Sequence, residues 1–351
     1  MKNKKLNSFK LKFSICMPAY NGGEVIEETV KSILSQSFKN YEFIIMDDNS
    51  TDNTAEVLKS FKDSRIKYFK NKKNLGYSKN LEECRKKATG DIIYLMGQDD
   101  ILAKDAILDT YEAFEISKDI GAVTRPYYWF DKDIKKPVRA KEQLNPKNDE
   151  IVRITDDKKK LITLFSTLDQ LSGLALRRKY IDVPFHEDIF PCHVYPFASI
   201  FKKHPVVFLK DYNLAVRIGS SQCRSPKMYK RKTSYIYDKS PIQSWVDMFN
   251  NVFYEKGFKE FREYMIENFV AVNYVGLVQI RNYTEYRYLL REIWILLKYR
   301  WQNIYNLQFW FFSLGCIVIP PRLLIPMVDW YKNKINSKRL KNIKFKYILV
   351  K

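Results

Sequence analysis

Short apolar runs alternate with amphipathic stretches from about residue 13 to residue 130. The apolar runs are rich in strand formers, and the stretches between them carry apolar residues three to four positions apart, as in a helix buried on one face. The expected strands are FSICMP (13–18), YEFIIMD (41–47), RIKYF (65–69), DIIYLMG (91–97) and IGAVTRPYYWF (120–130). Because these strands are apolar on both faces, the pattern predicts an α/β fold with a mostly parallel sheet flanked by helices.

The pattern changes twice after residue 130. A polar, lysine-rich stretch (131–169) predicts a long excursion, and HPVVFLKDYNLAVRIG (204–219) then predicts a strand pair or one long strand. From about residue 240 the chain predicts helices dense in aromatic residues. We therefore expect a basic N-terminal tail (1–12), an α/β domain (13–239) and a helical, aromatic and basic C-terminal region (240–351).

Polar residues follow three of the expected strands directly. Asp47 and Asp48 end the second strand, Asp99 and Asp100 follow the fourth, and the first strand runs into AYNGG (19–23). Right-handed crossovers place the carboxyl ends of parallel strands at one edge of a sheet, where ligands of α/β proteins bind. An isolated Asp-Asp pair is usually a solvated turn, but this position predicts a binding crevice.

Charge and cysteine usage narrow the function classes only in part. The chain has 351 residues and a formal net charge of +21, which favours nucleic acid, an anionic membrane surface or a phosphorylated substrate. The five cysteines are scattered without a C-x-x-C pair, so we expect free thiols in a reducing cytosol and no zinc site. We expect no signal peptide, and no apolar run reaches the roughly 18–20 residues of a membrane span.

Four ordered motifs carry a family resemblance: FSICMPAYNGG, SILSQSFKNYEFIIMDDNSTDNT, NLGYSKN and GDIIYLMGQDD. Together they resemble family 2 glycosyltransferases with the GT-A fold. The likeness covers residues 13–130 and continues weakly to about Gly219. It implies inverting transfer of a hexose or acetamidohexose from a nucleotide sugar such as a UDP-sugar. The acceptor would be a lipid-linked glycan in surface polysaccharide synthesis.

The resemblance also assigns the nucleoside site. It places Asp48 where a carboxylate accepts a hydrogen bond from a pyrimidine N–H. Pro18, Tyr20 and Asn21 would contact the same base. The alternative for Asp48 is a favourable charge at the start of a helix, which stabilises that helix mildly.

The acidic pair is expected to hold a divalent cation. By resemblance Asp100 is the principal ligand of Mg²⁺ or Mn²⁺, and Asp99 reaches the ribose or the metal. Such a cation neutralises charge on the leaving diphosphate. Gly97 stands where the family usually has a further Asp. Lys79 and Arg217 are expected to contact phosphate or pyrophosphate, although Lys79 would equally suit a solvated helix.

The catalytic base is the least defined part of the expected site. Inverting transfer needs a group that deprotonates the acceptor hydroxyl. The family's acidic pair falls within VPFHEDIFPCHVYPFASIFKK, near Cys192 and His193. Asp188 and His193 are equal candidates, with Glu187 behind them. The alternative is that His193 is structural and the two acids belong to a turn.

The C-terminal region combines apolar, aromatic and basic residues. The stretch Phe309–Pro321 has no charge, is too short to span a bilayer and is followed by Arg322 and a basic tail. This composition favours an interfacial element on an anionic membrane. We expect a cytoplasmic protein attached peripherally to the inner face of the cell membrane. A packed helical subdomain is the alternative.

Three other functions stay open at this stage. A polyprenyl-phosphate glycosyl transferase would share the fold but use a lipid phosphate as acceptor. A catalytically inactive family member acting as a binding protein would explain the irregular base region. A basic nucleic-acid-binding protein would explain the charge, but no nucleic-acid module is recognisable and the ordered motifs account for the acids. We therefore expect no nucleic-acid partner.

Overall fold

The computed structural model describes most of the chain. It covers residues 9–188, 190–218, 239–320, 323–324, 326–328, 330, 340 and 343–346, apart from the side chain of Tyr283. Most of the predicted basic tail, including Arg322, therefore lies outside the described residues.

The first part of the chain alternates strands and helices in the order that the sequence predicts. Its elements are β1 (Phe13–Ala19), α1 (Ile26–Leu34), β2 (Tyr41–Asp47), α2 (Thr54–Ser60), β3 (Ile66–Lys70), α3 (Tyr77–Lys86), β4 (Ile92–Leu95), β5 (Ile101–Leu102), α4 (Ala106–Glu115) and β6 (Ala122–Thr124). Every residue of β1, β2 and β4 is buried, as expected for central strands covered on both faces.

The second part completes the α/β domain and adds the helical region. The remaining strands are β7 (Tyr128–Phe130), β8 (Pro137–Ala140), β9 (Glu150–Val152), β10 (Ala175–Arg177), β11 (Val206–Phe208) and β12 (Leu214–Arg217). The remaining helices before residue 218 are α5 (Lys158–Ser166), η1 (Thr167–Asp169), η2 (Arg178–Tyr180) and α6 (Val194–Phe201). Those after residue 239 are α9 (Pro241–Val252), η3 (Lys256–Phe258), α10 (Lys259–Met265), η4 (Ile266–Val270), α11 (Gly276–Tyr283), α12 (Tyr286–Tyr299), η5 (Trp301–Tyr305) and α13 (Leu307–Val318).

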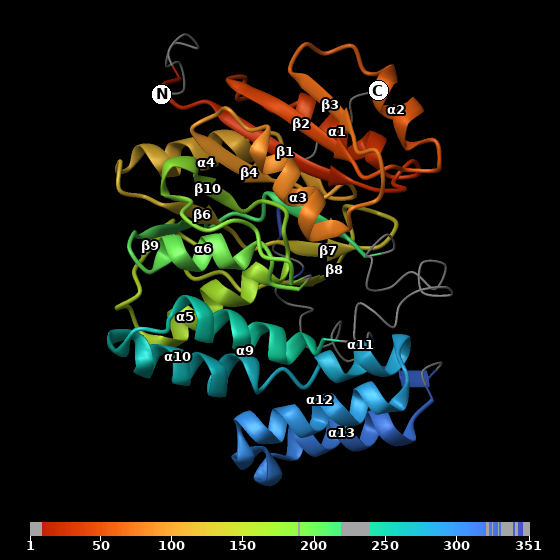
Figure 1. The fold of residues 1–351 in the computed structure, drawn as a ribbon, viewed down its shortest axis with the longest axis vertical. Coiled ribbons are helices and arrows are strands. Elements are labelled where there is room, and N and C mark those ends of the chain that lie inside the picture. Colours follow the sequence, from red (N-terminus) through yellow and green to blue (C-terminus); the bar gives the residue numbers. More distant parts are fainter. Residues whose placement is uncertain are drawn as a thin grey trace.

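One large mixed sheet organises the α/β domain. Its strand order is β3-β2-β1-β4-β10-β6-β11-β9. The four strands β3, β2, β1 and β4 are parallel, whereas β10 runs antiparallel to both β4 and β6. The predicted fold class, an α/β sheet flanked by helices with a helical C-terminal region, is confirmed (Figure 1).

The predicted fifth strand is two strands in two different sheets. β6 belongs to the large sheet, and β7 belongs to a small sheet of order β5-β12-β7-β8. The chain changes sheets at Arg125–Pro126, since proline lacks the N–H that a continuous strand would need. The buried Arg125 guanidinium links the segments around this crossing. It bonds to Gly173 O, to Ala106 O and to the side chains of Asn213 and Thr110. The predicted excursion after residue 130 likewise contains β8, β9 and α5.

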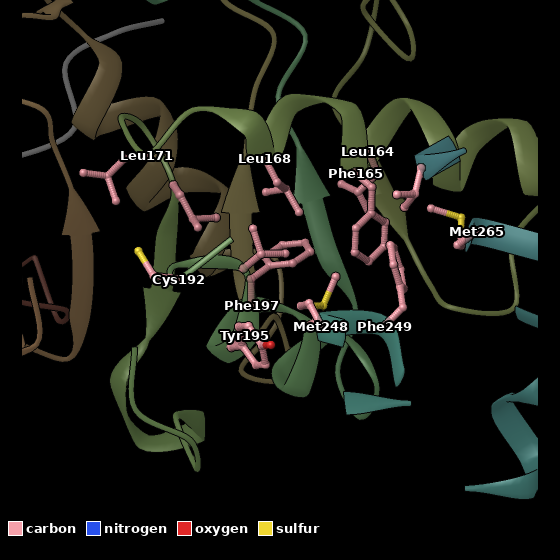
Figure 2. Packing of buried hydrophobic residues seen from close by; sticks show 14 of the residues in the cluster. Leu164, Phe165, Leu168, Leu171, Cys192, Tyr195, Phe197, Met248, Phe249 and Met265 are labelled. Carbon is pink, nitrogen blue, oxygen red and sulfur yellow. The ribbon is translucent and has the colours of Figure 1, made fainter. Parts of the chain in front are cut away.

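Two apolar clusters cover the two faces of the large sheet. One cluster includes Phe13, Ile15 and Phe43 together with residues of α1 and α4. The other joins β-strand residues to α3, α5, α6 and α9. Figure 2 shows the second cluster where Phe165 of α5, Phe197 of α6 and Phe249 of α9 meet. The helical region thus begins as part of the α/β core.

The last described residues return to the α/β domain. Backbone Lys104 N donates to Lys346 O at 3.1 Å, and the Phe345 ring lies 5.3 Å from the Tyr128 ring. Leu340, Ile343 and Phe345 pack on the cluster under the small sheet. We call residues 340–346 the C-terminal strap, of which 340 and 343–346 are described. This part of the predicted lipid-binding tail contacts protein.

Candidate active site

The carboxyl ends of β1, β2 and β4 meet at one edge of the large sheet. Ala19 at the end of β1 lies opposite Asp47 at the end of β2, and Cys16 of β1 lies opposite Leu95 at the end of β4. The loops that follow these strands therefore lie side by side. Backbone bonds from Asp48 N to Ala19 O and from Met96 N to Cys16 O continue the pairing into the loops.

Asp48 holds the loop that leads into α3. Its carboxylate is buried and accepts bonds from Asn71 Nδ2 at 2.8 Å, Leu75 N at 2.8 Å and Gly76 N at 2.9 Å. Gly76 has φ +84°, a conformation that favours glycine. Asp47 is buried as well and accepts from Ser50 N and the Tyr68 hydroxyl. Asp48 thus shapes the edge where a nucleoside base is expected, and its base contact stays a prediction.

The loop after β1 is fastened to the acidic turn after β4. The Gln98 side-chain amide accepts from Tyr20 N at 2.9 Å and donates to Tyr20 O at 3.0 Å. A Cβ at Gly22 would lie 2.5 Å from Gln98 Oε1, so only glycine admits this approach. Asn21 has φ +47°, and its Oδ1 accepts from Thr51 N. Pro18, one residue from the end of β1, is buried in the strand and pairs in register with Met46.

Asp100 is buried and surrounded by neutral donors. Its Oδ2 accepts from the Gln170 side chain and from Ser172 Oγ, and its Oδ1 accepts from Arg217 N at 3.1 Å. Burial raises the pKa of the Asp100 carboxyl well above its ordinary value, and the charge of Asp99 adds to the effect. A Cβ at Gly97 would lie 3.1 Å from Asp99 Oδ1 and 3.2 Å from Asp100 Oδ2. The two acids therefore converge beside Gly97, the position that the family usually fills with a third.

The two predicted phosphate contacts have protein partners. Arg217 donates Nε to Asp99 O at 3.3 Å and pairs through Nη2 with Glu28, while its guanidinium lies over the Phe130 ring. Lys79 is largely exposed and lies 3.4 Å from the carboxylate of Glu187. Such an exposed pair contributes little stability and opens readily. Both cations lie close to the predicted site, Arg217 beside the acidic turn and Lys79 in the first turn of α3.

The three predicted base candidates lie in different environments. Asp188 is buried, and its oxygens bond to Ser244 Oγ at 2.8 Å and Lys239 Nζ at 2.6 Å, which ties it to the start of α9. Glu187 is 80% exposed beside Lys79. His193 is buried, and its Nε2 lies 2.8 Å from Leu168 O. Burial lowers the pKa of His193 to about 4, so the ring is neutral and Nε2 donates to that carbonyl.

Three polar residues of the site carry no signal that the sequence alone would reveal. Gln98, Gln170 and Ser172 orient the loops and the acidic pair through their side chains. Gln98 directly precedes the acids Asp99 and Asp100, but nothing in the sequence indicates its bonds to Tyr20. Gln170 and Ser172 are separated from Asp100 by about seventy residues, and only the pairing of β10 with β4 brings them together.

This edge, with its loops and acids at the carboxyl ends of parallel strands, is where ligands of α/β proteins bind. Residues 14–182 match the family model described as glycosyl transferase family 2. The resemblance to this family that the motifs predict is therefore confirmed over residues 14–182.

Known relatives match part of the chain, and solved structures match nearly all of it. The chain is 38% identical over 88 residues to the UDP-Glc:alpha-D-GlcNAc-diphosphoundecaprenol beta-1,3-glucosyltransferase WfgD of Escherichia coli, covering 25% of this chain and 35% of that protein. The chain spans only 34% and 40% of the length of two other curated relatives. The crystal structure of S. aureus TarS 1–349 in complex with UDP-GlcNAc superposes with a TM-score of 0.61 at 13% identity, covering 97% of this chain and 94% of that one. The mannosyltransferase PcManGT from Pyrobaculum calidifontis, in complex with GDP-Man and Mn²⁺, gives a TM-score of 0.52 at 14% identity, covering 89% and 87%.

Proposed function

We propose that the protein transfers a sugar, with inversion, from a nucleotide-sugar donor to a lipid-linked glycan acceptor. The observation that carries this proposal is the acidic turn Asp99–Asp100 at the same sheet edge as Asp48 and the Tyr20–Asn21 loop. This edge offers polar groups for a nucleoside at one end and acids for a diphosphate at the other. The names of WfgD and of the TarS complex support a UDP-sugar donor, and the name of WfgD supports a diphosphoundecaprenol-linked acceptor.

The acidic pair fits a divalent cation shared with the donor. Among the described residues no cluster of three or more His, Cys, Asp and Glu side chains could hold a metal. Mg²⁺ and Mn²⁺, however, are commonly bound by one or two carboxylates together with substrate phosphates. The partners of Asp100 named above are all neutral, so a cation would compensate its charge, with the converging Asp99 carboxylate as a second oxygen ligand. Bound there, the ion would neutralise charge that develops on the departing diphosphate.

The protein groups around the acids would orient the donor. Ser172 Oγ donates to Asp100 and accepts from Gly97 N at 2.7 Å, which fixes the carboxylate against the turn. Partners of this kind hold metal ligands in place. Gln98 sets the distance between the loop after β1 and the acidic turn through its two bonds to Tyr20. The donor would lie along the edge with its nucleoside near β1 and β2 and its diphosphate near β4.

A binding screen tests the donor proposal. UDP-Glc, UDP-Gal, UDP-GlcNAc, UDP-GalNAc and GDP-Man are each added to the full chain with and without Mn²⁺, and the melting temperature and nucleotide release are recorded. One UDP-sugar should raise the melting temperature in a Mn²⁺-dependent manner and release UDP. Asp100→Asn should remove the metal dependence while keeping the melting temperature of the free protein within a few degrees. Failure of all five donors to stabilise the protein or release nucleotide would refute the proposal.

The helical region supports attachment to a membrane surface. No helix among the described residues is long and apolar enough to cross a bilayer. Helix α13 buries Phe309 and Cys316 on one side, and Arg281 of α11 donates to Cys316 O at 2.8 Å. Its outer face exposes Leu307, Phe311, Leu314 and Val318, at helical spacing. Exposed Leu290 and Trp294 lie on α12, beside α13 at the end of the molecule opposite β3 (Figure 1).

An apolar outer face of this kind is better suited to contact with a membrane surface than to full exposure to water. Exposed apolar patches of this kind mark interaction sites. Lys298 lies 5.4 Å from the Trp294 ring, and the chain is strongly basic, so anionic lipid is the expected partner. The other side of α13 packs on the protein, which supports the alternative of a packed helical subdomain for that side.

Vesicle flotation tests the membrane proposal. The triple variant Phe311→Ser, Leu314→Ser, Val318→Ser should lose binding to vesicles of phosphatidylcholine and phosphatidylglycerol. The control Ile116→Ser changes an equally exposed apolar residue on another face and should float like the wild type. Binding should fall at high salt, since charge screening weakens the attraction to anionic lipid. Equal flotation of the triple variant and the control would contradict the assignment of this face.

A further inference from the structure

The turn that precedes β10 places an acid beside the acidic pair, on the side away from the nucleoside loops. Across the sheet the order is β2, β1, β4 and β10. The chain enters β10 at the same edge, because Gly173 N donates to Leu95 O and Leu95 N donates to Leu174 O. A donor with its nucleoside at β1 and β2 and its diphosphate at β4 would direct its sugar toward this turn.

Asp169 is the acid that this turn presents. The flanking Leu168 and Leu171 are buried in the apolar cluster and point into it (Figure 2). Asp169 and Gln170 lie between these two leucines and outside the apolar cluster, and Gln170 bonds to Asp100. The Asp169 side chain is 49% exposed, whereas the Asp188 side chain is 3% exposed and bonded to α9. Asp169 therefore combines closeness to the acidic pair with access for a substrate.

The surroundings of Asp169 hold its carboxylate in one orientation. Its Oδ1 accepts from the Tyr127 hydroxyl, and Lys141 Nζ lies 2.8 Å from Oδ2. His193 fixes the backbone of the turn by donating to Leu168 O, the residue before Asp169. The ring of Trp129 lies 4.8 Å from that of Tyr127 and beneath the Arg139 guanidinium, which provides an aromatic wall next to the carboxylate. Such a wall is a general feature of sites that receive sugar rings.

We propose that Asp169 is the general base of the transfer; this inference rests on the function proposed above. The acceptor hydroxyl oxygen forms a bond to the anomeric carbon of the donor sugar. The bond from that carbon to the diphosphate oxygen breaks, and its electron pair leaves on the nucleoside diphosphate. The hydroxyl proton passes to the Asp169 carboxylate.

A nucleophile that carries no proton distinguishes a base from a structural acid. Azide can attack the anomeric carbon without deprotonation, so it bypasses a missing base. The assay uses the full chain and whichever of the five nucleotide sugars above releases nucleotide, with water as acceptor or with added sodium azide. Variants Asp169→Ala and Asp169→Asn are compared with Asp133→Asn, an acid of similar exposure, 45%, in the β7–β8 turn.

Both Asp169 variants should lose about 10²- to 10⁴-fold in nucleotide release with water, the usual contribution of a general base. Nucleotide affinity by calorimetry should change less than about threefold, which also reports that the variant is folded. Azide should restore release by Asp169→Ala and yield a glycosyl azide of inverted configuration, while Asp133→Asn should match the wild type throughout. Near-wild-type release by either Asp169 variant overturns the inference, as does a loss that azide does not repair or a loss of nucleotide affinity. An inactive wild type instead refutes the proposed function, and this inference with it.

Discussion

His193→Gln isolates the contribution of one buried histidine to acid stability. Glutamine keeps an amide N–H that can donate to Leu168 O but has no group that titrates. The pKa of His193 is about 4 in the folded protein, against about 6.5 for an unfolded chain. The folded state therefore excludes a proton that the unfolded state binds below pH 6.5.

The sign and size of the effect follow from this difference. A depressed folded-state pKa contributes stability that is fully present above pH 6.5 and is lost as the pH falls from 6.5 to about 4. The difference between the two pKa values corresponds to about 3 kcal/mol of unfolding free energy at full loss. The wild type should thus lose about 3 kcal/mol more than His193→Gln over this range. Glu42 and Asp63, whose folded pKa values are lowered to about 2, titrate equally in both proteins and cancel.

Urea unfolding at pH 7, 6, 5 and 4 measures the effect. Leu168→Ala is the control, because it removes buried apolar surface from the same turn and no titrating group. It should lower the free energy of unfolding by about 2–5 kcal/mol at every pH and run parallel to the wild type. Between pH 7 and pH 4 the free energy of unfolding of the wild type should fall by about 3 kcal/mol relative to that of His193→Gln. Parallel curves for wild type and His193→Gln would show that the histidine is charged or solvated, contrary to the structure.

Two further predictions concern the nucleotide edge. Asp48→Ala should weaken UDP binding by about 1–3 kcal/mol in calorimetry, because it frees the loop bonded through Asn71, Leu75 and Gly76; an unchanged affinity would reduce Asp48 to a charge at a helix start. Gln98→Ala should lower nucleotide affinity and turnover together, without lowering the melting temperature by more than a few degrees. Gly22→Ala should have the same effects, because its Cβ would displace the Gln98 amide. Variants that differ in either measure would separate the two residues.

The sequence predicts the parts of the fold that depend on local pattern. Strands β1 to β4 follow from short runs rich in apolar residues, and the position of Asp48 and Asp99–Asp100 at one edge follows from strand order. The second sheet does not follow, because Arg125–Pro126 interrupts a run that looks continuous, and β5 and β12 meet only through the tertiary fold. Pattern alone does not reveal which strand crosses to another sheet.

The candidate base illustrates a second limit. His193 was expected near the site because the family motif falls there, and the structure places it at the start of α6, behind the turn that carries Asp169. Asp188 and Glu187 lie two and one residues from His186 in a segment that contacts α3 and α9. A sequence motif fixes the order of residues along the chain, whereas the direction of a side chain depends on what its neighbours bury.

The C-terminal strap has a consequence for synthesis of the protein. Its Phe345 covers Tyr128, and Lys346 accepts a backbone bond from Lys104 after β5, so the small sheet is completed by residues that leave the ribosome long after β7. N-terminal domains usually fold while translation continues. Here the large sheet can form early, but the side of the domain that carries β7 and β12 stays open until the helical region has been made. A polypeptide stopped before residue 340 would lack part of the cover over the cluster that contains Ile101, Tyr128 and Phe130, and we expect it to be a better target for chaperones and proteases than the full chain.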